Sequence, residues 1–162
     1  MSSFTPHSPY NETMEWYTPP YIFEALNIAF DTDVCSPGHD KVPWIPAAAH
    51  IILPIDGLKV PWYGRIWMNP PYGKLTRAWF ERFVKHPCGI ALAFSRTDTA
   101  WFHQCASQCD AILFMRKRIR FIDYLGYEGG TPGNGSMLVA NGADCVKALK
   151  DSNLGIVWEI VK

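Results

Sequence analysis

The sequence predicts an α/β fold, a compact single sheet with helices on its faces. Short apolar runs typical of buried strands alternate along the chain with stretches whose apolar residues recur at helical spacing. Polar clusters follow three of these runs, at Asp31 and Asp33, at Asn69, and at Arg96 and Asp98. Because the carboxyl ends of parallel strands meet at one edge of a sheet, this recurrence predicts one cleft along that edge.

Prolines mark the first predicted helix, and side chains that alternate between two faces mark the first predicted strand. Thr18 is a good N-cap, and Pro19-Pro20 suit the start of a helix, so a helix is predicted over 20–27. An alternating strand is predicted over 29–34, followed by a break at Cys35-Ser36-Pro37-Gly38. An acid near a strand end and a turn of small residues often hold a nucleoside-like cofactor, which can approach the backbone there.

Further along, strands are predicted where apolar residues run together and helices where they recur every three or four residues. Pro43 and Pro46 indicate a loop before the second strand region. The expected segments are a loop over 41–49, an apolar run over 50–53, a strand over 65–68, a helix over 75–85, a strand over 89–94, a helix over 99–108, a strand over 111–121, a glycine-rich loop over 123–135, a strand over 136–140, a helix over 143–150 and a strand over 154–161.

The stiffest motif is Asn69-Pro70-Pro71-Tyr72, which follows the 65–68 strand. Each proline fixes φ, and Pro70 keeps Asn69 out of the helical region. The Asn69 side-chain oxygen and the Pro70 carbonyl can accept the two hydrogens of one planar amine, while Tyr72 stacks on the ring that carries it. Two such acceptors favour attack by the nitrogen, which predicts methylation of an exocyclic amine. The plainer interpretation is a Pro-Pro turn that only ends a strand.

A second feature is the dense basic run within the 111–121 strand. Arg116, Arg118 and Arg120 are expected to alternate onto one face of it. Three arginines on one strand face are suited to tracking phosphates. The alternative is a strand edge protected by charge. The 123–135 loop is expected to close over a substrate.

Composition favours one globular domain. The chain has 162 residues, of which 48% are hydrophobic and 19% charged, so disorder is excluded. The formal net charge is 0, from 15 basic and 15 acidic residues, whereas nucleic-acid binders are usually basic. Any contact with a nucleic acid must therefore be local.

Cysteine usage and hydropathy indicate a reduced, cytoplasmic protein. The 5 cysteines form no C-x-x-C pair, and the 5 histidines do not complete a zinc pattern, so no metal site is expected. No window approaches the ~20 apolar residues of a membrane span, and the N-terminus lacks a signal pattern. Residues 1–13 are expected to form a flexible lead-in to a single methyltransferase domain over 14–162.

Over residues 14–142 the chain resembles the phage-type (Dam-like) DNA N6-adenine methyltransferase family. The residues that carry this resemblance are Glu15-Trp16-Tyr17-Thr18-Pro19, Phe30-Asp31-Thr32-Asp33-Val34-Cys35-Ser36-Pro37, Trp67-Met68-Asn69-Pro70-Pro71-Tyr72-Gly73, Ser95-Arg96-Thr97-Asp98-Thr99-Ala100-Trp101-Phe102, Arg118-Ile119-Arg120-Phe121 and Gly135-Ser136-Met137-Leu138-Val139. The Asn-Pro-Pro-Tyr motif alone is shared by several methyltransferase families, and the ordered set is more specific.

The resemblance implies a class I (Rossmann-like) methyltransferase fold, S-adenosylmethionine as methyl donor and adenine in DNA as acceptor. It implies that Asn69, Pro70, Pro71 and Tyr72 hold the flipped base. It also implies a cofactor site lined by Trp16, Tyr17, Thr18, Pro19, Asp33, Cys35 and Ser36. Arg96 and Asp98, with the three strand arginines, are candidates for contacts with DNA. One departure is a single glycine, Gly38, where many methyltransferases carry Gly-x-Gly.

Other substrates and a non-enzymatic role stay open at this point. The same motif suits an RNA adenine, a protein glutamine or the N4 amine of cytosine. A DNA-binding relative that has kept the fold without catalysis is the alternative from a different class. The oligomeric state and the recognition sequence are not predicted by any of these observations. Marking of phage DNA against host nucleases is implied by the resemblance only.

Overall fold

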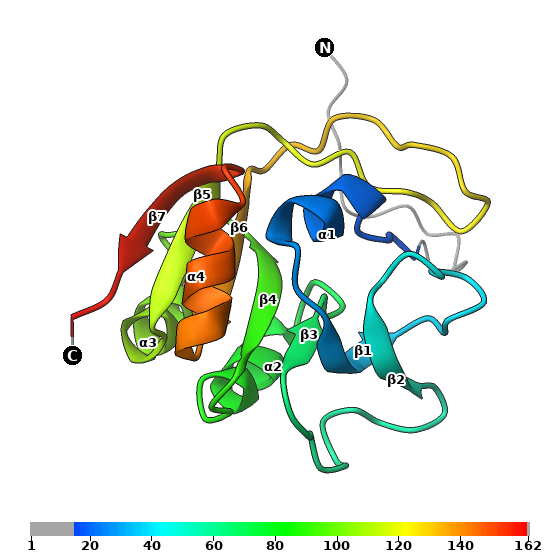
Figure 1. Ribbon diagram of the computed structural model, residues 1–162, viewed down its shortest axis with the longest axis horizontal. Coiled ribbons are helices and arrows are strands. Elements are labelled where there is room, and N and C mark those ends of the chain that lie inside the picture. Colours follow the sequence, from blue (N-terminus) through cyan, green and yellow to red (C-terminus); the bar gives the residue numbers. More distant parts are fainter. Residues whose placement is uncertain (1–14, 162) are drawn as a thin grey trace.

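A computed structural model describes residues 15–161, so the 1–13 lead-in lies outside the described residues. Its elements are α1 (Pro20–Leu26), β1 (Phe30–Ser36), β2 (Ala47–Ile52), β3 (Ile66–Met68), α2 (Thr76–Phe83), β4 (Gly89–Phe94), α3 (Ala100–Cys105), η1 (Ala106–Gln108), β5 (Ala111–Met115), β6 (Ser136–Asn141), α4 (Ala143–Asp151) and β7 (Gly155–Glu159). The predicted mixed α/β architecture is confirmed, as one 7-stranded sheet with the order β2-β1-β3-β4-β6-β5-β7 (Figure 1).

Strands β2, β1, β3 and β4 pair in parallel, whereas β6 runs antiparallel between β4 and β5 and β7 runs antiparallel to β5. The chain passes from β1 to β2 on one side and then returns to β3 on the other. The order therefore reverses at β1, and the crevice between the carboxyl ends of β1 and β3 is where ligands bind in open α/β sheets.

Two hydrophobic clusters cover the two faces of the sheet. One includes residues of α1 and α4, and the other includes residues of α2 and α3. Strand β3 contributes to both, because successive side chains point to opposite faces. Trp67 enters the first cluster, and Ile66 and Met68 enter the second. All three side chains are fully buried, which fixes the strand that carries the Asn-Pro-Pro-Tyr motif.

Most predicted elements are confirmed within a few residues, including the start of α1 at Pro20, but the N-cap of α1 and the end of β1 differ. The N-cap of α1 is Pro19 without a side-chain hydrogen bond, so the predicted Thr18 cap is wrong. Strand β1 continues through Cys35 and Ser36, which we expected in the break. Pairing of Ser36 with Ile52 of β2 extends the strand.

Strand β2 also begins earlier than predicted. Ala47 to Ala49 fall in the segment predicted as loop, yet they form the first half of β2. Alanine has a low preference for strands, and Pro46 precedes the run, so the local signal indicated a loop. Parallel pairing with β1, from Phe30↔Ala47 onward, overrides it.

The prediction of a strand over the whole of 111–121 is wrong. Strand β5 ends at Met115, and Arg116, Arg118 and Arg120 lie beyond it in irregular backbone. The strand ends there because neither neighbouring strand continues to pair with it. Pairing of β5 with β6 ends at Phe114↔Met137, and pairing with β7 ends at Met115↔Gly155. The three arginines therefore do not share one strand face.

None of the described helices is both long enough and apolar enough to cross a membrane.

The turn at Gly57 fixes the end of β1 against α2. A Cβ added to Gly57 would lie 2.2 Å from the Val34 carbonyl oxygen and 2.7 Å from the Trp79 ring. We expect Gly57→Ala to lower the free energy of unfolding by about 2 kcal/mol, because neither backbone nor buried ring can move away cheaply. Urea denaturation measures this. Gly130→Ala is the control, since a Cβ at Gly130 meets nothing within 4 Å. Equal stability of the two variants would contradict the close packing.

Candidate active site

The Asn-Pro-Pro-Tyr motif leaves β3 at the point where the strand order reverses. Asp33 of β1 pairs with Trp67 of β3, so the register places Cys35, near the end of β1, beside Asn69, the first residue after β3. Pro70 is buried and Asn69 is half-buried, whereas Tyr72 remains 38% exposed. The stiff turn therefore presents the Asn69 amide and the Tyr72 ring at the crevice.

The Asn69 side chain is held by two hydrogen bonds. Its Nδ2 donates to the Trp16 carbonyl oxygen at 3.3 Å, and its Oδ1 accepts from the Tyr72 hydroxyl at 3.4 Å. The first bond fixes which end of the amide faces the crevice. Because an amide oxygen has two lone pairs, Oδ1 keeps one for a further donor.

Tyr72 belongs to an aromatic group at the carboxyl edge of the sheet. Its ring stacks on Phe94, the last residue of β4, with centroids 4.2 Å apart and planes inclined by 24°. Phe94 in turn packs edge-to-face with Phe121, with ring centroids 6.3 Å apart. Phe94 thus supports one face of the Tyr72 ring, while the residue as a whole stays partly exposed to solvent.

The segment from Trp16 to Pro19 joins the motif to the glycine-rich loop. In this segment the Trp16 carbonyl accepts the hydrogen bond from Asn69. Tyr17 pairs with Ile122 through two backbone hydrogen bonds, of 2.7 and 3.0 Å. Trp16 also packs so closely on Gly129 that a Cβ there would lie 2.5 Å from the indole ring. The structure therefore brings together three segments that lie far apart in the sequence.

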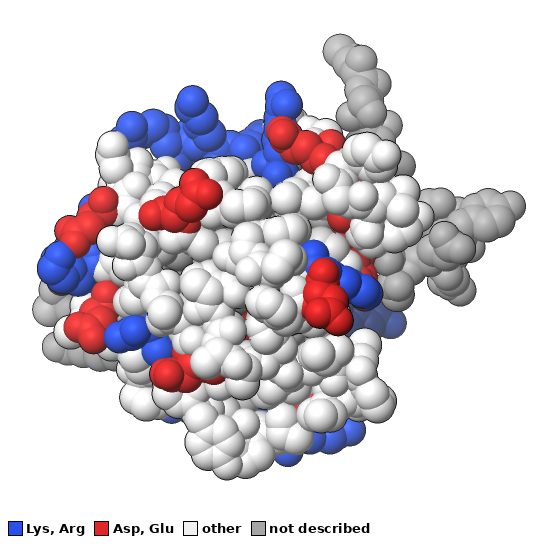
Figure 2. Space-filling model, turned by 45° about the vertical axis from the view of Figure 1, so that its right-hand side comes forward, with Lys and Arg blue, Asp and Glu red and all other residues white. Residues whose placement is uncertain are grey.

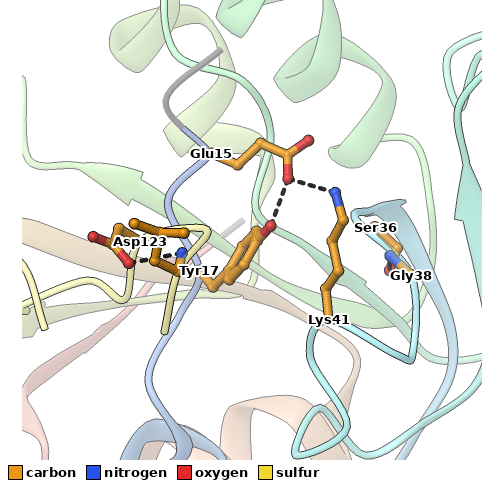
Figure 3. Close-up of polar contacts among 7 residues, drawn as sticks. Glu15, Tyr17, Ser36, Gly38, Lys41 and Asp123 are labelled. Atoms are coloured by element: carbon orange, nitrogen blue, oxygen red, sulfur yellow. Dashed lines mark hydrogen bonds and ion pairs between the residues drawn. The ribbon is translucent and has the colours of Figure 1, made fainter. Parts of the chain in front are cut away.

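Figure 3 shows how the same segment is tied to the turn after β1. The Glu15 carboxylate accepts from the Tyr17 hydroxyl at 2.5 Å and pairs with Lys41 at 3.0 Å, across from Ser36 and Gly38. The Tyr17 hydrogen bond and the Lys41 charge hold the pKa of Glu15 below its ordinary value. Burial, together with the Glu15 charge, raises the pKa of Tyr17. The hydrogen bond between Tyr17 and Glu15 therefore persists at neutral pH and holds this segment beside the turn after β1.

The turn after β1 is organised by buried polar side chains. Asp33 Oδ1 accepts from the Cys35 amide at 3.3 Å, and Ser36 Oγ accepts from the Gly38 amide at 3.0 Å. His50 of β2 lies beside both, with Nδ1 2.8 Å from Ser36 Oγ and 3.7 Å from Asp33 Oδ2. Sequence reasoning missed His50, because it stands in an apolar run and only the β1–β2 register places it beside Asp33.

Two buried polar atoms around this crevice have no hydrogen-bond partner among the described residues. They are Thr18 Oγ1 and His50 Nε2. Burying a polar atom without a partner costs free energy, roughly 1–3 kcal/mol. Such atoms fit a polar ligand that satisfies them when it binds.

Arg96 and Asp98 follow β4 on an exposed turn at the same edge of the sheet. The backbone carbonyl of Arg96 accepts from both the amide and the hydroxyl of Thr99, at 3.2 and 2.7 Å. This turn starts α3 and leaves both charged side chains on the surface.

The arginines after β5 differ in their surroundings. Arg118 donates to the carbonyl oxygens of Pro132 and Gly133, at 2.6 and 2.8 Å, and Arg120 pairs with Glu128 at 3.3 Å. Both therefore brace the glycine-rich loop. Arg116 and Lys117 are exposed, and within residues 15–161 their side chains form no hydrogen bond or ion pair. Figure 2 shows Lys and Arg side chains gathered along the upper edge, where Figure 1 places the segment after β5.

The tip of the 123–135 loop is a second feature that sequence reasoning missed. The Asp123 carboxylate accepts from the amides of Leu125 and Tyr127, both at 2.9 Å, which closes a tight turn. Tyr124, Leu125 and Tyr127 project from it with exposed fractions of 53%, 63% and 69%. The only sequence signal was three large apolar residues in a loop rich in glycine.

Cys35 gives the turn after β1 a testable dependence on pH. Burial, with the neighbouring Asp33 charge, raises the pKa of Cys35 from 9.0 to about 12. Between these values the folded protein binds more protons than the unfolded chain, so the free energy of unfolding falls as pH rises. We expect Cys35→Ser to reduce this fall between about pH 9 and pH 11. Urea denaturation at several pH values measures it, and identical pH profiles for variant and wild type would contradict the burial of the thiol.

With the geometry established, comparison with known proteins identifies the family. The model of the family described as DNA N-6-adenine-methyltransferase (Dam) matches residues 5–141. Since this match covers more than half of the chain, the chain belongs to that family, as the sequence motifs predicted, and it is an adenine-specific DNA methyltransferase. No curated protein matches the chain.

Proposed function

We propose that this enzyme uses S-adenosylmethionine to methylate the N6 amine of an adenine that has been flipped out of DNA. The observation that carries the proposal is the position of Asn69, Pro70 and Tyr72. These residues stand at the carboxyl end of β3, beside the turn after β1. An acceptor amide, a backbone carbonyl and a supported aromatic face thus share one crevice.

We further propose that the fold is the class I, Rossmann-like methyltransferase fold, formed by one domain over 14–162. Support comes from the reversal of strand order at β1 and from the antiparallel strand β6 between β4 and β5. Because helices cover both faces of the sheet, the two ligands are expected to bind at its carboxyl edge.

The proposed cofactor site lies between the Trp16–Pro19 segment and the carboxyl end of β1, which carries Asp33, Cys35 and Ser36. The residues fit a nucleoside-like group, because Thr18 Oγ1 and His50 Nε2 are buried without a partner among residues 15–161 and Gly38 has φ +109°. Asp33 supports the turn through the Cys35 amide, and Ser36 supports it through the Gly38 amide. When bound, S-adenosylmethionine supplies an electrophilic methyl group.

In the proposed mechanism the protein positions the amine and excludes water. Tyr72, backed by Phe94, stacks on the flipped adenine. Asn69 Oδ1 and the Pro70 carbonyl accept the two N6 hydrogens, which turns the nitrogen lone pair away from the ring. Pro71 keeps this turn rigid. Most of the rate effect comes from this positioning. Because the amine is itself the nucleophile, no covalent bond to the protein is required.

The proposed DNA contacts lie on both sides of this crevice. Arg116 and Lys117 are free to neutralise phosphates, and Arg96 is exposed at the neighbouring strand end. The tip formed by Tyr124, Leu125 and Tyr127 is suited to contact unstacked bases, because large apolar side chains wedge between base steps in several DNA-bending proteins. Flipping costs a few kcal/mol, and these contacts offset it. We place the activity in the cytoplasm, where unmethylated DNA is accessible.

The proposed activity is tested by incubating the protein with labelled S-adenosylmethionine and unmethylated DNA, followed by nucleoside analysis. We expect N6-methyladenine as the labelled product. Label in RNA adenine, in cytosine N4 or in a glutamine amide, with none in DNA adenine, would contradict the proposal.

Asn69 provides the most direct variant. We expect Asn69→Ala to lower kcat by about 100- to 1,000-fold, because one of the two acceptors for the amine is lost, while cofactor affinity stays unchanged. Asn69→Asp is the matched control, since it keeps acceptor oxygens, while it loses the bond to Trp16 and adds a negative charge. We expect it to retain about tenfold more activity than Asn69→Ala. Turnover and calorimetric cofactor binding measure both effects, and near-normal turnover of Asn69→Ala would refute the role.

The basic segment gives a prediction about salt dependence. Removing Arg116 and Lys117 together, both to Ala, is expected to weaken DNA binding and to reduce the slope of log K against log salt by about 2. Lys147→Ala with Lys150→Ala is the control, because it removes the same charge from α4. Fluorescence anisotropy at several salt concentrations measures the slope. An equal change in both double variants would show that only net charge matters.

A further inference from the structure

Strand β7 forms one edge of the sheet. Among the described residues it pairs only with β5, in the register Ala111↔Glu159 to Met115↔Gly155 (Figure 1). An edge strand presents a row of backbone N–H and C=O groups to solvent, and natural proteins usually protect it with lysine, proline or a bulge. The sequence of β7, Gly-Ile-Val-Trp-Glu, contains neither lysine nor proline, and its pairing with β5 shows no register shift.

The hydrogen bonds at its two ends show which residues face outward. The Ile160 amide donates to the Asp110 carbonyl at 2.9 Å, and the Leu154 carbonyl accepts from the Arg116 amide at 2.9 Å. Because the backbone N–H and C=O groups of successive residues point to opposite sides of a strand, those of Ile156 and Trp158 also face β5. Those of Gly155, Val157 and Glu159 face away from the sheet.

The side chains of β7 are unusually apolar for a surface strand. Ile156 is 65% exposed and Trp158 is 63% exposed, and both point to the same side of the sheet because they are two residues apart. Trp158 rests on Phe114 of β5 with ring centroids 5.6 Å apart. Two large apolar side chains therefore stand together beside a strand edge that no other described strand pairs with.

We propose that two copies of this chain associate through β7, with antiparallel pairing about a two-fold axis at Val157. In this register Val157 pairs with Val157 of the second copy, and Gly155 pairs with Glu159. All three outward-facing residues then form hydrogen-bonded pairs, and the two sheets become one continuous sheet.

The same register matches the side chains. Ile156 of each copy lies opposite Trp158 of the other, in a non-hydrogen-bonded pair where side chains approach most closely. Aromatic and β-branched residues are a favourable cross-strand pair. The acidic Glu159 lies opposite glycine, and its carboxylate is already engaged by Lys150 of its own copy, so like charges do not meet. The strand is thus complementary to itself in shape, polarity and charge.

The expected dimer is a weak one. Only five residues of each copy pair, which places the interface at the small end of specific protein contacts. We therefore expect a dissociation constant on the order of micromolar. The active-site residues lie across the sheet from this edge, because three strands separate β3 from β7 and four separate β1 from β7.

The test is the mass of the full chain measured by sedimentation equilibrium from about 1 to about 300 µM. We expect the mass to rise toward twice that of one chain. Ile156→Lys should weaken association by at least about 30-fold, because it places a charge opposite Trp158. Leu125→Lys is the matched control, since Leu125 is 63% exposed on the distant loop, and it should associate like wild type.

Two further measurements keep the proposal falsifiable. Val157→Pro removes an outward N–H and no bond to β5, so it should give a folded monomer by circular dichroism. Hydrogen exchange should show that the amides of Gly155, Val157 and Glu159 gain protection as concentration rises, because the N–H groups of these outward-facing residues enter the new ladder. A wild-type monomer at every concentration would overturn the proposal. So would a dimer that Ile156→Lys leaves intact, or one that Leu125→Lys disrupts equally.

Discussion

The arrangement at the crevice depends on the parallel pairing of β3 with its two neighbours. Only Ile66, Trp67 and Met68 form this strand, yet it pairs with β1 on one side and with β4 on the other. Its side chains are fully buried in two different clusters, so it cannot slip by one residue without moving Trp67 out of one cluster and into the other. A rigid Pro-Pro turn after such a strand places Asn69 and Tyr72 at a defined position without support from a helix.

A second constraint comes from the start of the described chain. The segment of Trp16 and Tyr17 contacts the motif through Asn69, the glycine-rich loop through Ile122 and Gly129, and the turn after β1 through Glu15 and Lys41. It therefore couples the proposed base, cofactor and DNA contacts.

Local chemistry made much of this predictable. The α/β class, the strand before Asn69 and the helices after it follow from apolar runs, helical spacing and prolines. Features set by distant partners were not predictable. Strand β5 ends at Met115 because its partners end, and β2 includes Ala47 because β1 pairs with it. His50 was missed for the same reason, since only the register of two strands places it beside Asp33. The loop tip was missed because Asp123 orders it through hydrogen bonds that no sequence period reveals.

The central claim is that Asn69, Pro70 and Tyr72 together hold the amine of an extrahelical adenine. The most direct measurement is a crystal structure of the enzyme with duplex DNA and a non-reactive analogue of S-adenosylmethionine. We predict an adenine stacked on the free face of Tyr72, with N6 within about 3 Å of both Asn69 Oδ1 and the Pro70 carbonyl oxygen. An adenine that stays in the helix, or one bound away from Asn69, would contradict the account.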